Sequence, residues 1–163
     1  SENATRLTMY LPDDDFKKII QASPLISIDL LVRNEHDEYL FGERLNEPAK
    51  NYWFVPGGRI LKDETIAQAL NRISANELNV HFQLEQAQFH GVWQHFYQNN
   101  FFNDEFTTHY VVLAYIFNVE KKSIHPPRTQ HQRFKWLRKE EILMDSTIHK
   151  YSTSYFADND VKK

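Results

Sequence analysis

The sequence contains no cysteine, only four glycines and two methionines among its 163 residues. Without cysteine, the chain can form neither a disulfide framework nor a thiolate metal site, and we expect a reducing compartment, the cytoplasm. No apolar run approaches the ~20 residues that a membrane-spanning helix needs, so no membrane partner is expected. No secretory signal is found either, and we interpret residues 1–8, before Met9, as a leader or expression remnant.

The sequence also lacks a basic excess. Nineteen Lys and Arg residues face 22 Asp and Glu residues, which gives a net charge of −3. Proteins that bind nucleic acid usually carry a strong positive excess, so nucleic acid is not an expected partner. Hydrophobic residues make up 41% and aromatic residues 14% of the chain. This composition excludes disorder for most of the chain and supplies rings for a core or for stacking on a nucleobase or sugar.

The pattern predicts one domain over residues 9–163, because the chain has no internal repeat, low-complexity segment or linker. Propensity and turn signals predict strands over residues 25–33, 38–43, 52–55, 80–96, 107–119 and 134–137, the first two joined as a hairpin. They predict helices from residue 13 to about 23, over 65–78 and over 139–144, the last as the terminal helix. Strands and helices follow one another without regular βαβ alternation, which favours an α+β domain with a mixed sheet. Three aromatic residues indicate that the tail from residue 145 packs on another surface, which the sequence does not identify: Tyr151, Tyr155 and Phe156.

Two of the four glycines are adjacent, Gly57 and Gly58, directly after a predicted strand and Pro56. Adjacent glycines permit positive φ and let the backbone approach a ligand closely. A plain tight turn is the alternative explanation for the pair.

Glu77 lies in the apolar stripe of the helix predicted after the glycines. At 100° per residue, Leu70, Ile73 and Glu77 all fall within about 40° of Ile66. An unpaired ionised carboxylate that faces a core is costly. Glu77 therefore needs a metal ion, an arginine or exposure at the helix end, and the sequence leaves these three open.

The glycine loop and this helix resemble the signature of the Nudix hydrolases. Five residues match that loop–helix–loop signature at the right spacing: Gly58, Glu64, Arg72, Glu77 and Val80. The resemblance implies a Nudix fold, which is an α/β/α sandwich with a mixed β-sheet. Within it, Arg72 and Glu64 are expected to form an ion pair that stabilises this loop–helix–loop segment, the Nudix cassette.

Three positions depart from the signature. Ile73 and Asn76 stand where the family has glutamates, and Asn79 stands where it has its last glycine. In typical members, carboxylates at the positions of Ile73, Asn76 and Glu77 share one helix face and hold several divalent ions. With Glu77 alone, this face can hold one ion, whose other ligands must be neutral oxygens. Either the site is inactive, or the reaction takes place at a different position of the substrate.

Three further segments favour a reaction at a different position of the substrate: residues 51–59, 91–97 and 106–113. They are similar to the GDP-mannose mannosyl hydrolases, a Nudix subfamily with the same degenerate cassette, and the resemblance runs from about residue 16 to 137. It implies hydrolysis of GDP-mannose, and often GDP-glucose, by substitution at the sugar C1 with inversion. The products are GDP and free hexose, and the protein is usually a homodimer.

The resemblance also implies a metal site. One Mg²⁺ per subunit, for which Mn²⁺ can substitute, is held by the Gly57 carbonyl, the Glu77 carboxylate, the Gln130 side chain and pyrophosphate oxygens. This set is chemically sensible, because Mg²⁺ prefers oxygen ligands and accepts one carboxylate plus substrate phosphates. Arg44 and Arg59 are expected to bind phosphate oxygens, which a planar guanidinium can engage through two bonds.

Further residues take roles around the substrate by the same resemblance. Asp29 is expected to position Arg44 or the sugar, although a buried structural ion pair would also explain it. The general base is expected to be His131, beside Gln130, because a histidine's ordinary pKa is close to neutral. His95 is its main competitor. The remaining candidates face the diphosphate or sugar (Tyr110 and His95) or stack on guanine (Phe16 and Tyr97).

Two other functions stay open. A conventional Nudix pyrophosphatase would cut between the phosphorus atoms and give GMP and sugar phosphate. A binding module would hold the nucleotide sugar without turnover.

Overall fold

The computed structural model describes residues 11–45, 49–100, 102, 106–127 and 133–157. Its elements follow one another along the chain as α2 (Asp13–Ala22), β1 (Leu25–Arg33), β2 (Glu38–Glu43), β3 (Trp53–Phe54), β4 (Gly57–Arg59), α3 (Ile66–Leu78), the 3₁₀ turn η1 (Leu84–Gln86), β5 (Gln88–Tyr97), β6 (Thr108–Asn118), the 3₁₀ turn η2 (Lys121–Ser123), β7 (Phe134–Arg138), α4 (Lys139–Met144) and α5 (Lys150–Ser154).

A mixed sheet forms the middle of the fold. Its strand order is β3-β2-β1-β6-β5, with β4 paired to β1 and β7 paired to β2. β1 runs antiparallel to β2 and β4 but parallel to β6. Most of its residues are buried, which explains its nearly continuous apolar sequence. The predicted α+β class with a mixed sheet is therefore confirmed.

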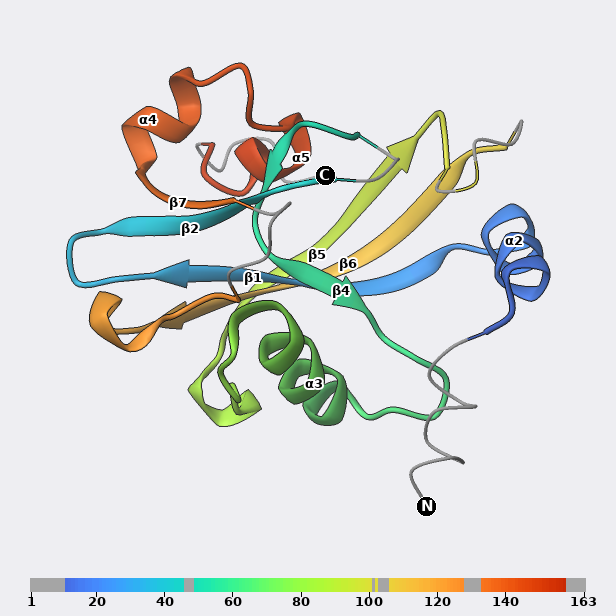
Figure 1. Cartoon of the computed structure of the whole chain (residues 1–163), viewed down its shortest axis with the longest axis horizontal. Coiled ribbons are helices and arrows are strands. Elements are labelled where there is room, and N and C mark those ends of the chain that lie inside the picture. The colour runs from blue at the N-terminus through green and yellow to red at the C-terminus, as the bar shows by residue number, and fades with distance from the viewer. Residues whose placement is uncertain (1–10, 46–48, 101, 103–105, 128–132, 158–163) are drawn as a thin grey trace.

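Helices cover both faces of this sheet, α3 on one side and α4 with α5 on the other (Figure 1). Because side chains alternate along a strand, β1 supplies both faces. Toward α3 it presents Ile28, Leu30 and Val32, and toward α4 and the C-terminal segment it presents Leu31. Each fully buried side chain of this kind stabilises the fold by about 1.5–3 kcal/mol. The arrangement is the expected α/β/α sandwich.

The cassette helix α3 begins and ends as its sequence predicts. The Thr65 side chain caps its first turn, and Asn79 ends it in a left-handed conformation at φ 57°. Arg72 donates to Glu64 through Nε at 2.8 Å and through Nη2 at 2.9 Å, and Nη2 also donates to the Arg59 carbonyl at 2.7 Å. The predicted Arg72–Glu64 ion pair is confirmed, and it ties the loop after β4 to the helix.

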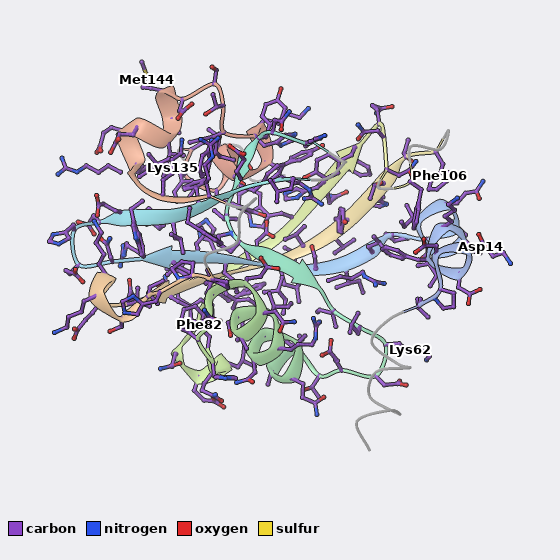
Figure 2. The ribbon with its side chains drawn as sticks, in the orientation of Figure 1. Asp14, Lys62, Phe82, Phe106, Lys135 and Met144 are labelled. Carbon is purple, nitrogen blue, oxygen red and sulfur yellow. The ribbon has the colours of Figure 1, made fainter. Side chains whose placement is uncertain are left out.

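The strand predicted over residues 80–96 is wrong for its first half. Residues 80–87 form a loop with the turn η1, and β5 begins at Gln88. The Phe82 N–H donates to Ser74 Oγ of α3 at 2.9 Å, and the Phe82 ring, labelled in Figure 2, stacks on Phe117 at 4.3 Å. The alternating apolar residues of this segment therefore close the end of the α3 core and do not pair with a strand.

The tail after α4 contains a further helix, α5, so α4 is not terminal. Tyr155 and Phe156 are buried against the sheet, and the Phe156 ring packs on Tyr39 at 4.6 Å. The tail therefore does pack, and the surface that the sequence left open is the sheet of this domain. Among the described residues, no helix has the length and apolar character needed to cross a membrane.

Candidate functional site

The candidate site opens where β1 exchanges its partner strand. At one end of β1, Arg33 pairs with Tyr39 of β2; at the other end, residues 27–29 pair with residues 57–59 of β4. The end of β2 and the start of β4 separate from each other around a pocket of about 430 Å³. Eight of the residues predicted from the sequence line it: Asp29, Arg44, Gly57, Arg59, Glu77, His95, Tyr97 and Tyr110.

Three predicted residues are not placed in this pocket lining. Phe16 of α2 lies beside it, with the Arg59 Cζ 4.3 Å from the centre of its ring. Gln130 and His131 lie outside the described residues, so the structure assigns them no position.

Gly57 and Gly58 form strand β4, and neither has a positive φ. The pair thus shows neither the positive φ that glycine permits nor the alternative of a plain tight turn, and the need for glycine has another cause. A Cβ on Gly57 would collide with Asp29 Oδ1 and lie 2.5 Å from the Ile28 carbonyl oxygen. A Cβ on Gly58 would lie 3.1 Å from the Ile73 side chain. The glycines let β4 lie directly against β1 and α3.

Glu77 is half-buried and lines the pocket from the last turn of α3. Burial raises the pKa of its carboxyl, and the positive charge of Arg44 opposes that rise. Within the described part of the chain, no hydrogen bond or ion pair engages this carboxylate. Ile73 is only 2% exposed and belongs to the core, whereas Asn76 is exposed. Glu77 is thus the one carboxylate that these three cassette positions offer to the pocket.

Two guanidinium groups line the same pocket. Arg44, just after β2, lies 5.4 Å from the Phe54 ring, and Arg59 lies against Phe16. Burial holds the pKa of Arg59 below its usual value. Neither guanidinium forms an ion pair with a carboxylate among the residues that the structure describes. Both are therefore available to an anionic ligand such as a diphosphate.

Asp29 supplies a second carboxyl to the pocket. Its Oδ2 accepts a hydrogen bond from the Tyr155 hydroxyl at 2.5 Å. Burial raises its pKa to about 6, although the Tyr155 hydrogen bond and the Arg44 charge act in the other direction. The alternative of a buried structural ion pair is thus replaced by a tyrosine hydrogen bond.

His95 is 6% exposed and lies deep in the pocket wall. Its ring stacks on Tyr151 at 4.2 Å, and its Nε2 lies 3.3 Å from the Tyr155 hydroxyl oxygen. Burial, assisted by His149, lowers its pKa to about 4. His95 is therefore neutral near pH 7 and a weak proton acceptor, which argues against it as the general base.

The sequence did not identify His149 and the helix α5, which pack directly behind residues of the pocket lining. His149 stacks on Phe54 at 4.8 Å, and the Tyr151 hydroxyl donates to the Phe96 carbonyl at 2.7 Å. A second hollow of about 810 Å³, bordered by Tyr52 and His149, meets the first pocket at Tyr97. The aromatic residues of the tail were the available signal, but they indicated packing alone.

The low pKa of His95 predicts a loss of stability in acid. Its pKa is about 4 in the folded protein, whereas a histidine ordinarily has a pKa of 6.5, so the unfolded chain takes up the proton first. The stability is present above about pH 6.5 and is lost as pH falls toward 4. At about pH 5 the loss is on the order of 2 kcal/mol.

Urea denaturation of the wild type and His95→Phe at about pH 7.5 and about pH 5 measures this loss. Phenylalanine keeps the stack on Tyr151 but cannot titrate. We expect the variant to lose 1–2 kcal/mol less than the wild type across this interval, roughly the size set by the shift. Equal losses in the two proteins would contradict the assignment.

Comparison with known proteins places this geometry in a family. The model of the family described as "NUDIX domain" matches residues 24–156. The chain is similar to the low-salt glycan biosynthesis protein Agl8 of Haloferax volcanii, with 36% identity over 132 residues, which cover 81% of this chain and 82% of that protein.

Solved structures share the fold. The MutT protein of Methanosarcina mazei Go1 matches with a TM-score of 0.64 and 20% identity, covering 83% of this chain and 92% of that chain. The NUDIX domain of Shewanella oneidensis NrtR, solved with ADP ribose, matches with a TM-score of 0.60 and 19% identity, covering 93% and 94%.

Proposed function

The chain belongs to the family of Nudix hydrolases, and from that premise we propose that it hydrolyses GDP-mannose, or GDP-glucose, to GDP and free hexose with the help of Mg²⁺. The observation that carries this proposal is the reduced carboxylate face of α3. Glu77 lines the pocket, whereas Ile73 belongs to the core and Asn76 is exposed. A face of this kind does not suit a mechanism that needs several ions around phosphorus.

Attack at the sugar carbon makes a smaller demand on metal ions. The departing group is then an intact GDP, whose negative charge must be neutralised as the C1–O bond breaks. Arg44 and Arg59 both line the pocket without a carboxylate partner among the described residues. They would bind the diphosphate and stabilise it as it leaves.

The donor set fits Mg²⁺. Glu77 offers carboxylate oxygens and Gly57 lies in the same lining, so its carbonyl is a candidate ligand, with Gln130 as the third. Among the described residues, no group of three His, Cys, Asp or Glu side chains could hold a metal ion. A site with one carboxylate and neutral oxygen ligands suits a hard cation that also takes substrate phosphate oxygens. When bound, the ion would add Lewis-acid stabilisation of the diphosphate.

The other residues divide the remaining tasks. His131 is proposed as the base that takes the proton from the attacking water, and Asp29 and Tyr110 would orient the sugar and diphosphate. His95, with its lowered pKa, serves as a neutral hydrogen-bonding group. Phe16, against Arg59, is the proposed stacking surface for guanine. Tyr97 lines the pocket as the second candidate for stacking on guanine, although only 7% of it is exposed.

The relatives support this substrate class. The name of the Haloferax volcanii protein assigns it to glycan biosynthesis, a process that uses activated sugars. The Shewanella oneidensis domain was solved with ADP ribose, a sugar joined to a nucleoside diphosphate. Both are compatible with a pocket that receives a nucleotide sugar.

The products of GDP-mannose in H₂¹⁸O with Mg²⁺ test the reaction. Phosphorus NMR is expected to detect GDP, and mass spectrometry is expected to find the label in the hexose, because water attacks carbon. GMP with sugar phosphate would identify a conventional pyrophosphatase. Bound but unchanged substrate would identify a binding module.

Glu77→Gln is expected to lower kcat by about 100-fold or more and to weaken Mg²⁺ activation, since it removes the charged ligand. Metal titration of activity measures both effects. Glu85→Gln, which removes an exposed carboxylate from η1, is the matched control and is expected to behave as wild type. Wild-type Mg²⁺ activation in Glu77→Gln would remove Glu77 from the metal site.

We also propose a homodimer formed through an apolar patch on the sheet face beside α3. Ile26, Phe89, Val92 and Phe96 make up this patch, and each is between 50% and 60% exposed. His109, which stacks on Phe96 at 4.4 Å, has a buried Nε2 without a hydrogen-bond partner among the described residues. Exposed apolar surface of this kind is typical of a subunit interface.

Sedimentation velocity is expected to find a dimer for the wild type and a monomer for Val92→Lys, because the lysine would bring an unpaired charge into the interface. Lys122→Glu, an exposed charge change at η2, serves as the control and should remain dimeric. A monomeric wild type at micromolar concentration would refute the dimer.

A further inference from the structure

Tyr155 reaches the site from the end of the chain. Its hydroxyl lies behind Asp29, which is 126 residues earlier in the sequence, while Tyr155 itself is outside the pocket lining. Only 4% of the residue is exposed, so Tyr155 is almost completely buried. A group placed here can act on substrate only through a neighbour.

The position of Tyr155 is fixed by contacts of the C-terminal segment near both edges of the sheet, at β5 and beside β3. Its ring packs edge-on against Trp93 of β5 at 4.9 Å, and its carbonyl accepts a hydrogen bond from His90 Nε2 at 3.0 Å. On the side of β3, Ser152 Oγ of α5 accepts from the Val55 N–H at 3.1 Å. These contacts hold the ring whether or not it carries a hydroxyl.

The hydroxyl and Gly57 together constrain both oxygens of Asp29. Oδ2 accepts from the Tyr155 O–H at 2.5 Å, a length typical of a hydroxyl bound to a carboxylate. Oδ1 lies against Gly57, at the place where a Cβ would stand. His95 Nε2 is 3.3 Å from the same hydroxyl oxygen. The single hydroxyl proton of Tyr155 points to Asp29. His95 can therefore form a hydrogen bond with this hydroxyl only by donating through Nε2–H to its oxygen.

Arg44 makes this constraint important. Its guanidinium lines the same pocket and attracts the Asp29 carboxylate. If Asp29 turned to pair with Arg44, the pocket would lose a free carboxylate and a free guanidinium in one movement. The hydrogen bond from Tyr155 opposes that movement.

We propose that Tyr155 is a positioning residue, whose hydroxyl holds the Asp29 carboxylate in its working orientation and thereby leaves Arg44 free for the diphosphate. The expected effect on turnover rests on the proposed function, whereas the contact between Tyr155 and Asp29 does not depend on it. A hydroxyl that merely satisfied a buried polar group would alter stability and leave turnover unchanged.

Tyr155→Phe tests the proposal, because it keeps the ring and removes the hydroxyl. With GDP-mannose and Mg²⁺, we expect kcat to fall by about tenfold or more because Asp29 is no longer oriented, and KM to rise because Arg44 is no longer free for the diphosphate. Tyr115→Phe, a buried tyrosine of the core on the opposite sheet face, is the matched control and is expected to keep the wild-type kcat.

A double-mutant cycle separates positioning from general destabilisation. In an Asp29→Asn background, Tyr155→Phe should reduce kcat by less than about twofold, because the residue through which it acts is already changed. An undiminished kcat in Tyr155→Phe, or the same fold loss in both backgrounds, would overturn the proposal. Thermal unfolding of each variant checks that the comparison is made between folded proteins.

Crystal structures of the wild type and Tyr155→Phe give a readout that does not depend on turnover. The Asp29 carboxylate is expected to turn toward Arg44 in the variant. An unchanged carboxylate would reject the positioning role. If the wild type releases no GDP, the proposed function fails, and the carboxylate orientation still decides whether Tyr155 holds Asp29.

Discussion

The close approach of β4 to β1 is the constraint on which the rest of the site depends. Gly57 lies against Asp29 so tightly that a single Cβ would collide with the carboxylate. β4 pairs with the part of β1 that β2 does not pair with, and the pocket opens between these two partner strands. A backbone contact thus creates the cavity and places a candidate carbonyl ligand next to a carboxyl group.

The cassette helix is attached to this contact and supplies the second carboxylate. The Ile73 side chain lies where a Cβ of Gly58 would touch it, and Arg72 joins Glu64 to the Arg59 carbonyl. These contacts fix the rotation of α3, and one turn later they direct Glu77 into the pocket. Ile73, at the position of one of the family's usual glutamates, belongs to the core here and offers no ligand to the pocket.

The C-terminal segment completes the opposite wall. α5 brings aromatic rings over the sheet face that carries Asp29 and His95. Burial on this face raises the pKa of Asp29 and lowers the pKa of His95. The carboxyl takes up its proton more readily and the imidazole less readily, so both tend toward their neutral forms. A water-poor wall of this kind strengthens the electrostatic contribution of Arg44 and Arg59 to a bound anion.

The sequence by itself determined the secondary structure that has a strong local signal and the family to which the chain belongs. The strands at residues 25–33 and 38–43, the helix capped by Thr65 and the Arg72–Glu64 pair all follow from neighbouring residues or fixed spacing. The residues lining the pocket were predicted through resemblance, and most of them do converge there. The tertiary structure alone decided what local pattern cannot encode: that residues 80–87 close a core, that Gly57 is needed for contact with Asp29, and that Tyr155 meets a carboxylate 126 residues away. The physical reason is that burial, hydrogen-bond partners and pKa depend on which distant surfaces exclude water together, whereas propensity and spacing depend on the neighbouring chain.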